Sequence, residues 1–136
     1  MESKRINITA GDCLNEILQR RYPEETFVPF REAMIEGRYT APLFSEAFIR
    51  ERAAFHGVGE AEYREKLAGF LEVLARPEAY SEIVLWFGDE PFCVENRETV
   101  LAALKQSGYR GSILLNTVIE ETGEILSSET LPQSEP

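Results

Sequence analysis

Two aspartates stand where a carboxylate could do chemistry. Asp12 and Asp89 are the only aspartates among 24 acidic residues, and each directly follows a glycine, Gly11 or Gly88, at the end of a predicted strand. Ligands of open parallel sheets bind outside the carboxyl ends of the strands, near the point where the strand order reverses. If the two strands are neighbours, the two aspartates can therefore face one cleft, where a carboxylate pair would hold a cation or divide acid and base roles.

This pair supports an enzymatic alternative and a structural one. In the enzymatic alternative, Asp12 and Asp89 serve as metal ligands or catalytic carboxylates of a hydrolase or transferase acting on a phosphorylated or nucleotide-like substrate, with Glu32 and Glu90 as candidate additions. In the structural alternative, Gly-Asp at a strand-to-helix turn supplies a flexible residue and a helix N-cap. Because such caps are frequent, we favour the structural interpretation.

Several basic side chains are candidate anion ligands. Arg31 directly follows the second predicted strand, and Arg50 and Arg52 lie on a predicted helix, where guanidinium groups can bind a carboxylate or phosphate bidentately. The many glutamates nearby favour a solvated salt-bridge face for these arginines instead. His56 ends the same helix, and its position favours an interaction with the helix dipole over general-base work.

The remaining reactive side chains give weaker signals. Cys93 at the start of a helix is expected to have a lowered thiol pKa, but no partner base is visible, so a catalytic thiol is a minor alternative. Cys13, Cys93 and His56 are too widely separated for a Cys/His metal centre, and we expect two free thiols. Trp86 and Phe87 end an apolar strand and are expected in the core. No phosphate-binding glycine loop or nucleophile elbow is present, and the cofactor is left open.

The elements that must position these residues follow from hydrophobic periodicity. Strands are predicted over 6–9, 26–30, 81–87 and 112–119, with a short antiparallel strand near 124–127, and helices over 13–21, 45–55, 60–76 and 94–107. The apolar run of strand 81–87 is typical of a parallel strand buried on both faces. The pattern predicts a three-layer α/β domain over residues 1–127, Rossmann-like, with a mostly parallel twisted sheet of about four to five strands and helices on both faces. Residues 128–136 are expected to form a flexible polar tail.

Composition restricts the partners. At 136 residues the chain is long enough for one core. Its net charge of −10 disfavours nucleic acid and anionic membrane surfaces as partners. No apolar run reaches the roughly 18 residues of a membrane span, and no signal peptide is visible, so we expect a cytoplasmic location.

Three segments together carry a family resemblance. They are Ile-Asn-Ile-Thr-Ala-Gly-Asp-Cys-Leu (6–14), Phe-Ile-Arg-Glu-Arg-Ala-Ala-Phe (48–55) and Val-Leu-Trp-Phe-Gly-Asp-Glu-Pro-Phe-Cys (84–93). Over about residues 5–119 the chain resembles the bacterial family called domain of unknown function 1835. In that family a Gln-containing stretch usually follows the acidic turn, whereas Val94 and Glu95 stand here. The resemblance implies an α/β domain, alone or within a longer chain, with no established activity to carry over.

The function we favour from the sequence is a regulatory module that binds a small polar ligand or a protein partner at the strand carboxyl ends. A third alternative is an assembly domain that forms a homo-oligomer, for which a large exposed apolar patch would be the signature. The candidate ligand-binding residues are Gly11, Asp12, Arg31, Arg50, Arg52, Gly88, Asp89 and Glu90.

Overall fold

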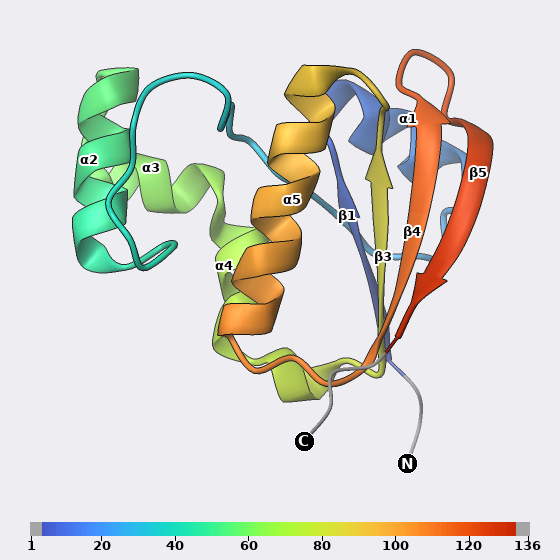
Figure 1. Cartoon of the computed structure of the whole chain (residues 1–136). Helices are drawn as coiled ribbons and strands as arrows, with labels where there is room; N and C mark the ends of the chain where they lie inside the picture. The colour runs from blue at the N-terminus through green and yellow to red at the C-terminus, as the bar shows by residue number, and fades with distance from the viewer. Residues whose placement is uncertain (1–3, 133–136) are drawn as a thin grey trace.

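The computed structural model describes residues 4–132, which form an α/β domain around a five-stranded sheet (Figure 1). The strand order is β2-β1-β3-β4-β5, with β2 to β4 parallel and β5 antiparallel to β4. The predicted fold class, with its mostly parallel sheet, is therefore confirmed. The elements are β1 (Arg5–Thr9), α1 (Asp12–Arg21), β2 (Phe27–Pro29), α2 (Glu46–His56), α3 (Glu60–Lys66), α4 (Ala68–Ala75), η1 (Pro77–Ala79), β3 (Glu82–Phe87), α5 (Pro91–Gln106), β4 (Ser112–Ile119) and β5 (Glu124–Leu131).

The central strands are buried on both faces, as the apolar run predicted. In β3, Leu85 and Phe87 are completely buried on one side, and Trp86 is 6% exposed on the other. Helix α5 lies against one face of the sheet, and α1 lies on the opposite face (Figure 1). Trp86 points to the α1 side, where its ring meets that of Tyr22. The expectation that Trp86 and Phe87 belong to the core is confirmed.

The prediction of one long helix over 60–76 is wrong in one respect, because this segment forms two helices, α3 and α4. The backbone bends at Leu67 (φ −107°, ψ 15°), between α3 and α4. The bend lets α3 pack on α2 while α4 packs on β2. At Gly69 the approach to the strand is so close that a Cβ would lie 2.8 Å from a side-chain carbon of Val28. Tyr63, Leu67 and Phe70 are buried on either side of the bend.

The end of the sheet also differs from the prediction. Strand β5 continues to Leu131, so residues 128–131, expected in a flexible tail, pair with residues 113–116 of β4. Polar side chains are tolerated there because an edge strand is held by its backbone ladder and exposes its side chains to solvent. Residues 133–136 of the predicted tail lie outside the described residues.

Candidate functional site

A hollow of about 430 Å³ opens at the carboxyl ends of β1 and β2. It brings together the predicted residues Gly11, Asp12 and Arg31. The Arg31 Nε atom donates to Asp12 Oδ1 at 2.8 Å, and its Nη1 atom donates to the Lys66 backbone oxygen at 3.0 Å. We call this the β1–β2 hollow; its lining residues are Ala10, Gly11, Asp12, Phe30, Arg31, Glu32, Ala33, His56 and Lys66.

Neither aspartate caps a helix, so the N-cap part of the structural interpretation is wrong. Helix α1 begins at Asp12 itself, which leaves Gly11 at the N-cap with no side-chain cap hydrogen bond. Helix α5 begins at Pro91 and has Glu90 at its N-cap, so Asp89 stands one residue too early to cap it. The first turn of α1 therefore presents uncapped backbone N–H groups beside the β1–β2 hollow.

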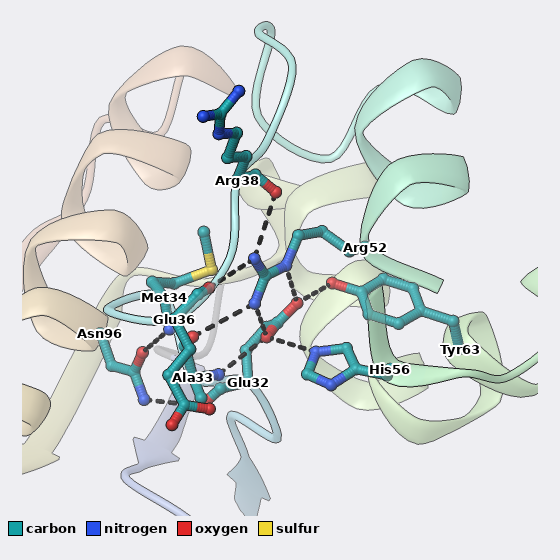
Figure 2. A network of polar contacts seen from close by, with 9 residues as sticks. All are labelled: Glu32, Ala33, Met34, Glu36, Arg38, Arg52, His56, Tyr63 and Asn96. Carbon is teal, nitrogen blue, oxygen red and sulfur yellow. Dashed lines mark hydrogen bonds and ion pairs between the residues drawn. The ribbon is translucent and has the colours of Figure 1, made fainter. Parts of the chain in front are cut away.

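Glu32, one of the lining residues of the hollow, forms a buried ion pair with Arg52 (Figure 2). The side chains of Glu32 and Arg52 are both completely buried, and they bind through two hydrogen bonds, Arg52 Nε to Glu32 Oε2 at 2.8 Å and Arg52 Nη2 to Glu32 Oε1 at 2.7 Å. Tyr63 donates its hydroxyl to Oε2 at 2.5 Å, and the Ala33 backbone N–H donates to Oε1 at 2.7 Å. His56 Nε2 lies 2.8 Å from the same Oε1 atom.

These contacts set the charge of Glu32. Burial alone would raise the pKa of its carboxyl group, but the donors from Arg52, Tyr63, Ala33 and His56 outweigh burial and lower the pKa to about 2. An ionised carboxylate only accepts hydrogen bonds, so His56 Nε2 carries a hydrogen toward it. The other ring nitrogen, Nδ1, has no partner among residues 4–132. Burial and the neighbouring Glu32 carboxylate raise the pKa of Tyr63, which is therefore neutral.

The same cluster holds the segment that leaves β2. Asn96 on α5 donates to the Glu32 backbone oxygen at 2.7 Å and accepts from the Met34 backbone N–H at 2.9 Å. Arg52 Nη1 donates to the backbone oxygens of Glu36 at 2.7 Å and Arg38 at 3.2 Å. We call Glu32, Arg52, His56, Tyr63 and Asn96 the Glu32 network. It holds residues 32–38, which connect β2 to α2, through hydrogen bonds from Arg52 and Asn96.

The Arg50 and Arg52 side chains lie in different environments although the residues are two positions apart. The Arg50 side chain is 68% exposed and lies 3.6 Å from a Glu60 oxygen, as expected of a solvated face. For Arg52 that expectation is wrong, because it belongs to the Glu32 network and cannot reach a ligand from there. The signal that could have revealed this is its spacing: Arg52 lies three and four residues after Ile49 and Phe48, on the buried face of α2.

The second predicted turn contributes to a different hollow. Gly88, Asp89 and Glu90 line a space of about 430 Å³ whose other charged lining residues are Glu120 and Glu121. Strands β1 and β3 are neighbours, as a shared cleft requires, but Asp12 and Asp89 line separate hollows. Within residues 4–132 no group of three or more His, Cys, Asp or Glu side chains is arranged to hold a metal ion. The two-aspartate centre therefore gains no support from the geometry.

Cys93 corrects the expectation of an activated thiol. It is 2% exposed, and its Sγ atom donates to the carboxylate of Glu120. Burial, reinforced by Glu120, raises the pKa of the thiol to about 12, which overrides the effect of the helix N-terminus. Cys93 is therefore a neutral thiol at physiological pH. Cys13 and Cys93 are both free, as expected.

Comparison with known proteins supplies no identity. No family model, no curated protein and no solved structure matches the chain. The resemblance to domain of unknown function 1835 stays a prediction. In the part of the chain that the structure describes, no helix combines the length and the apolar character needed to cross a membrane.

Proposed function

We propose that this domain is a binding module for a small anion, a phosphate or carboxylate group of a metabolite, in the β1–β2 hollow. The observation that carries the proposal is a local excess of positive charge. Arg31 and Lys66 line the hollow together with the His56 ring and the uncapped N-terminus of α1, in a chain whose net charge is −10. Anions are favoured where backbone N–H groups and basic side chains converge.

The acidic residues of the hollow do not cancel this charge. Glu32 is fully engaged with Arg52, so the pair adds no net charge. Asp12 is the other acidic lining residue; its side chain is 65% exposed and makes a single hydrogen bond to Arg31. Arg31 Nη2 and the Lys66 ammonium group have no partner among the described residues. These donors are available to an incoming oxyanion, and guanidinium suits bidentate binding of phosphate or carboxylate.

Binding is favoured over covalent catalysis by the lining chemistry. Among residues 4–132, no Ser, Thr or Cys lines the β1–β2 hollow, so none of these residues places a hydroxyl or thiol of that kind beside a bound ligand. His56 is held by Glu32 through Nε2, which leaves Nδ1 as an oriented contact for the ligand. A metabolite ligand agrees with the cytoplasmic location and the regulatory role that the sequence favours, and the domain of unknown function 1835 resemblance names no competing activity.

The test is a titration of the protein with inorganic phosphate, followed by backbone amide NMR signals at constant pH and ionic strength. We expect saturable shifts of the Gly11, Asp12 and Cys13 amides, and several-fold weaker binding in Lys66→Gln. The matched control is Lys105→Gln, an exposed lysine in the last turn of α5, which should bind like the wild type. Shifts that do not saturate, or equal weakening by the two lysine variants, would show that phosphate only screens the surface.

A further inference from the structure

We infer that a second hollow, on the α1 side of the sheet, binds a flat, uncharged ring compound that carries a hydrogen-bond acceptor. This hollow has a volume of about 290 Å³, near the lower limit for ligand pockets, which suits a single-ring molecule. It shares no lining residue with the β1–β2 hollow, so the inference is independent of the proposed anion site. We call it the ring hollow; its central lining residues are Tyr22, Phe27, Val84, Trp86, Leu114 and Asn116.

Three aromatic rings form its wall. The ring centroids of Tyr22 and Trp86 lie 6.0 Å apart, and those of Phe27 and Trp86 lie 6.2 Å apart, in tilted arrangements. Trp86 Nε1 donates to Asn7 Oδ1 at 2.9 Å, which satisfies the indole N–H and fixes the ring. Aromatic groups of this kind gain from edge or offset contacts with another ring. The wall therefore favours a flat apolar ligand.

Asn116 supplies the polar contact. Its side chain lines the ring hollow, yet the residue is only 3% exposed. Ser128 donates its hydroxyl to Asn116 Oδ1 at 2.6 Å, which orients the amide, and Asn116 Nδ2 has no partner among residues 4–132. Nδ2 is a free donor on a nearly buried side chain and is not fully enclosed, so a ligand oxygen or ring nitrogen can take the place of water against it. This unpartnered donor is the observation that points to a ligand.

The charged lining residues of the ring hollow, Arg5, Glu25 and Glu82, disfavour anions. Arg5 is already paired, through its Nε atom with Glu82 at 2.5 Å and through Nη1 with Glu25 at 3.5 Å. The two carboxylates exceed the single guanidinium in charge, so an anionic ring would be repelled at the entrance. An uncharged heteroaromatic or aryl amide avoids this repulsion and still offers an acceptor to Asn116.

The test uses benzamide as the probe and toluene as a ring of similar size without an acceptor. Trp86 is the only tryptophan in the chain, so its indole N–H gives one NMR signal that reports on the wall. We expect both probes to shift this signal saturably, and benzamide also to shift the Asn116 side-chain amide signals. Asn116→Leu should weaken benzamide about tenfold, the loss of one hydrogen bond, without weakening toluene.

Two further variants separate binding from folding. Ser128→Ala removes the hydroxyl that orients the Asn116 amide but keeps the Nδ2 donor, so benzamide affinity should fall less than in Asn116→Leu. Leu114→Trp fills the ring hollow and should abolish binding of both probes. The inference is overturned if neither probe shifts the Trp86 signal, or if Asn116→Leu weakens both probes equally. It is also overturned if the Trp86 signal moves with protein concentration alone, which would mean that a second copy covers this face.

Discussion

Two carboxylate–guanidinium pairs stand at the same end of the sheet and differ in their exposure to water. In Glu32–Arg52 both side chains are completely buried, and the carboxylate receives hydrogen bonds from four residues. In Asp12–Arg31 the side chains are 65% and 43% exposed and share one bond of 2.8 Å. The chemistry of the two pairs is the same, but their surroundings are not.

Burial decides what each pair can do. A buried charge cannot exchange its partner for water, so each member of the Glu32–Arg52 pair depends on the other and the pair holds the segment after β2 in place. An exposed pair contributes at most about 1 kcal/mol to stability and can open at little cost. Arg31 can therefore leave Asp12 to bind a ligand, whereas Arg52 cannot leave Glu32.

The largest effect should follow from breaking the buried pair. Arg52→Met leaves the Glu32 carboxylate without its main partner in a buried site and should lower the free energy of unfolding by about 3–5 kcal/mol. Urea unfolding measures this change. Arg50→Met is the matched control on the same helix, and its effect should stay within about 0.5 kcal/mol. Equal effects of the two variants would contradict the distinction.

Low pH should break the same Glu32–Arg52 ion pair by protonating Glu32. The pKa of Glu32 is lowered from 4.5 to about 2, so its contribution is present above pH 4.5 and is lost as the pH falls toward 2. At about 1.4 kcal/mol per pKa unit, the loss is on the order of 3 kcal/mol. Unfolding measured between these pH values should show this slope, and Glu32→Gln, although destabilised, should show a flatter one. A slope unchanged in Glu32→Gln would assign the acid sensitivity to other carboxyl groups.

A smaller effect is expected where a single donor is removed from Glu32. Tyr63→Phe deletes the hydroxyl that donates to the charged carboxylate at 2.5 Å and should cost about 1.5–3 kcal/mol in thermal or urea unfolding. Tyr109→Phe deletes a hydroxyl that donates to the Ser112 backbone oxygen at 3.0 Å, and a neutral bond of that kind is worth about 1 kcal/mol. If Tyr109→Phe lowers the free energy of unfolding as much as Tyr63→Phe does, the charge of Glu32 contributes nothing to the Tyr63–Glu32 hydrogen bond.

The fold is more predictable from the sequence than the site. The apolar run of β3 and the periodicity of α1 and α5 predict buried strands and flanking helices, because burial imposes these patterns locally. The bend at Leu67 depends on how α4 meets β2, and the length of β5 depends on pairing with β4. Neither is encoded in local periodicity.

The site depends on contacts between residues distant in the sequence. Tyr63 is the buried residue of α3 and fits an apolar position of the helix, yet its hydroxyl binds a carboxylate 31 positions away. Asn116 stands between apolar stretches of β4, and only the structure shows that it lines a hollow. Both Gly-Asp turns do follow strand ends, but the helix boundaries show that neither aspartate is a cap.

The most direct test of the anion site removes each member of the exposed Asp12–Arg31 pair in turn, since one change should strengthen phosphate binding and the other should weaken it. Asp12→Asn removes the one competing negative charge and frees Arg31, with a stability change of at most about 1 kcal/mol, the smallest effect expected here. The measurement is the phosphate dissociation constant of wild type, Asp12→Asn and Arg31→Gln, followed by the Gly11 amide signal. We predict that Asp12→Asn binds phosphate several-fold more tightly and Arg31→Gln several-fold more weakly than the wild type. Equal dissociation constants for the three proteins would contradict an anion site in the β1–β2 hollow.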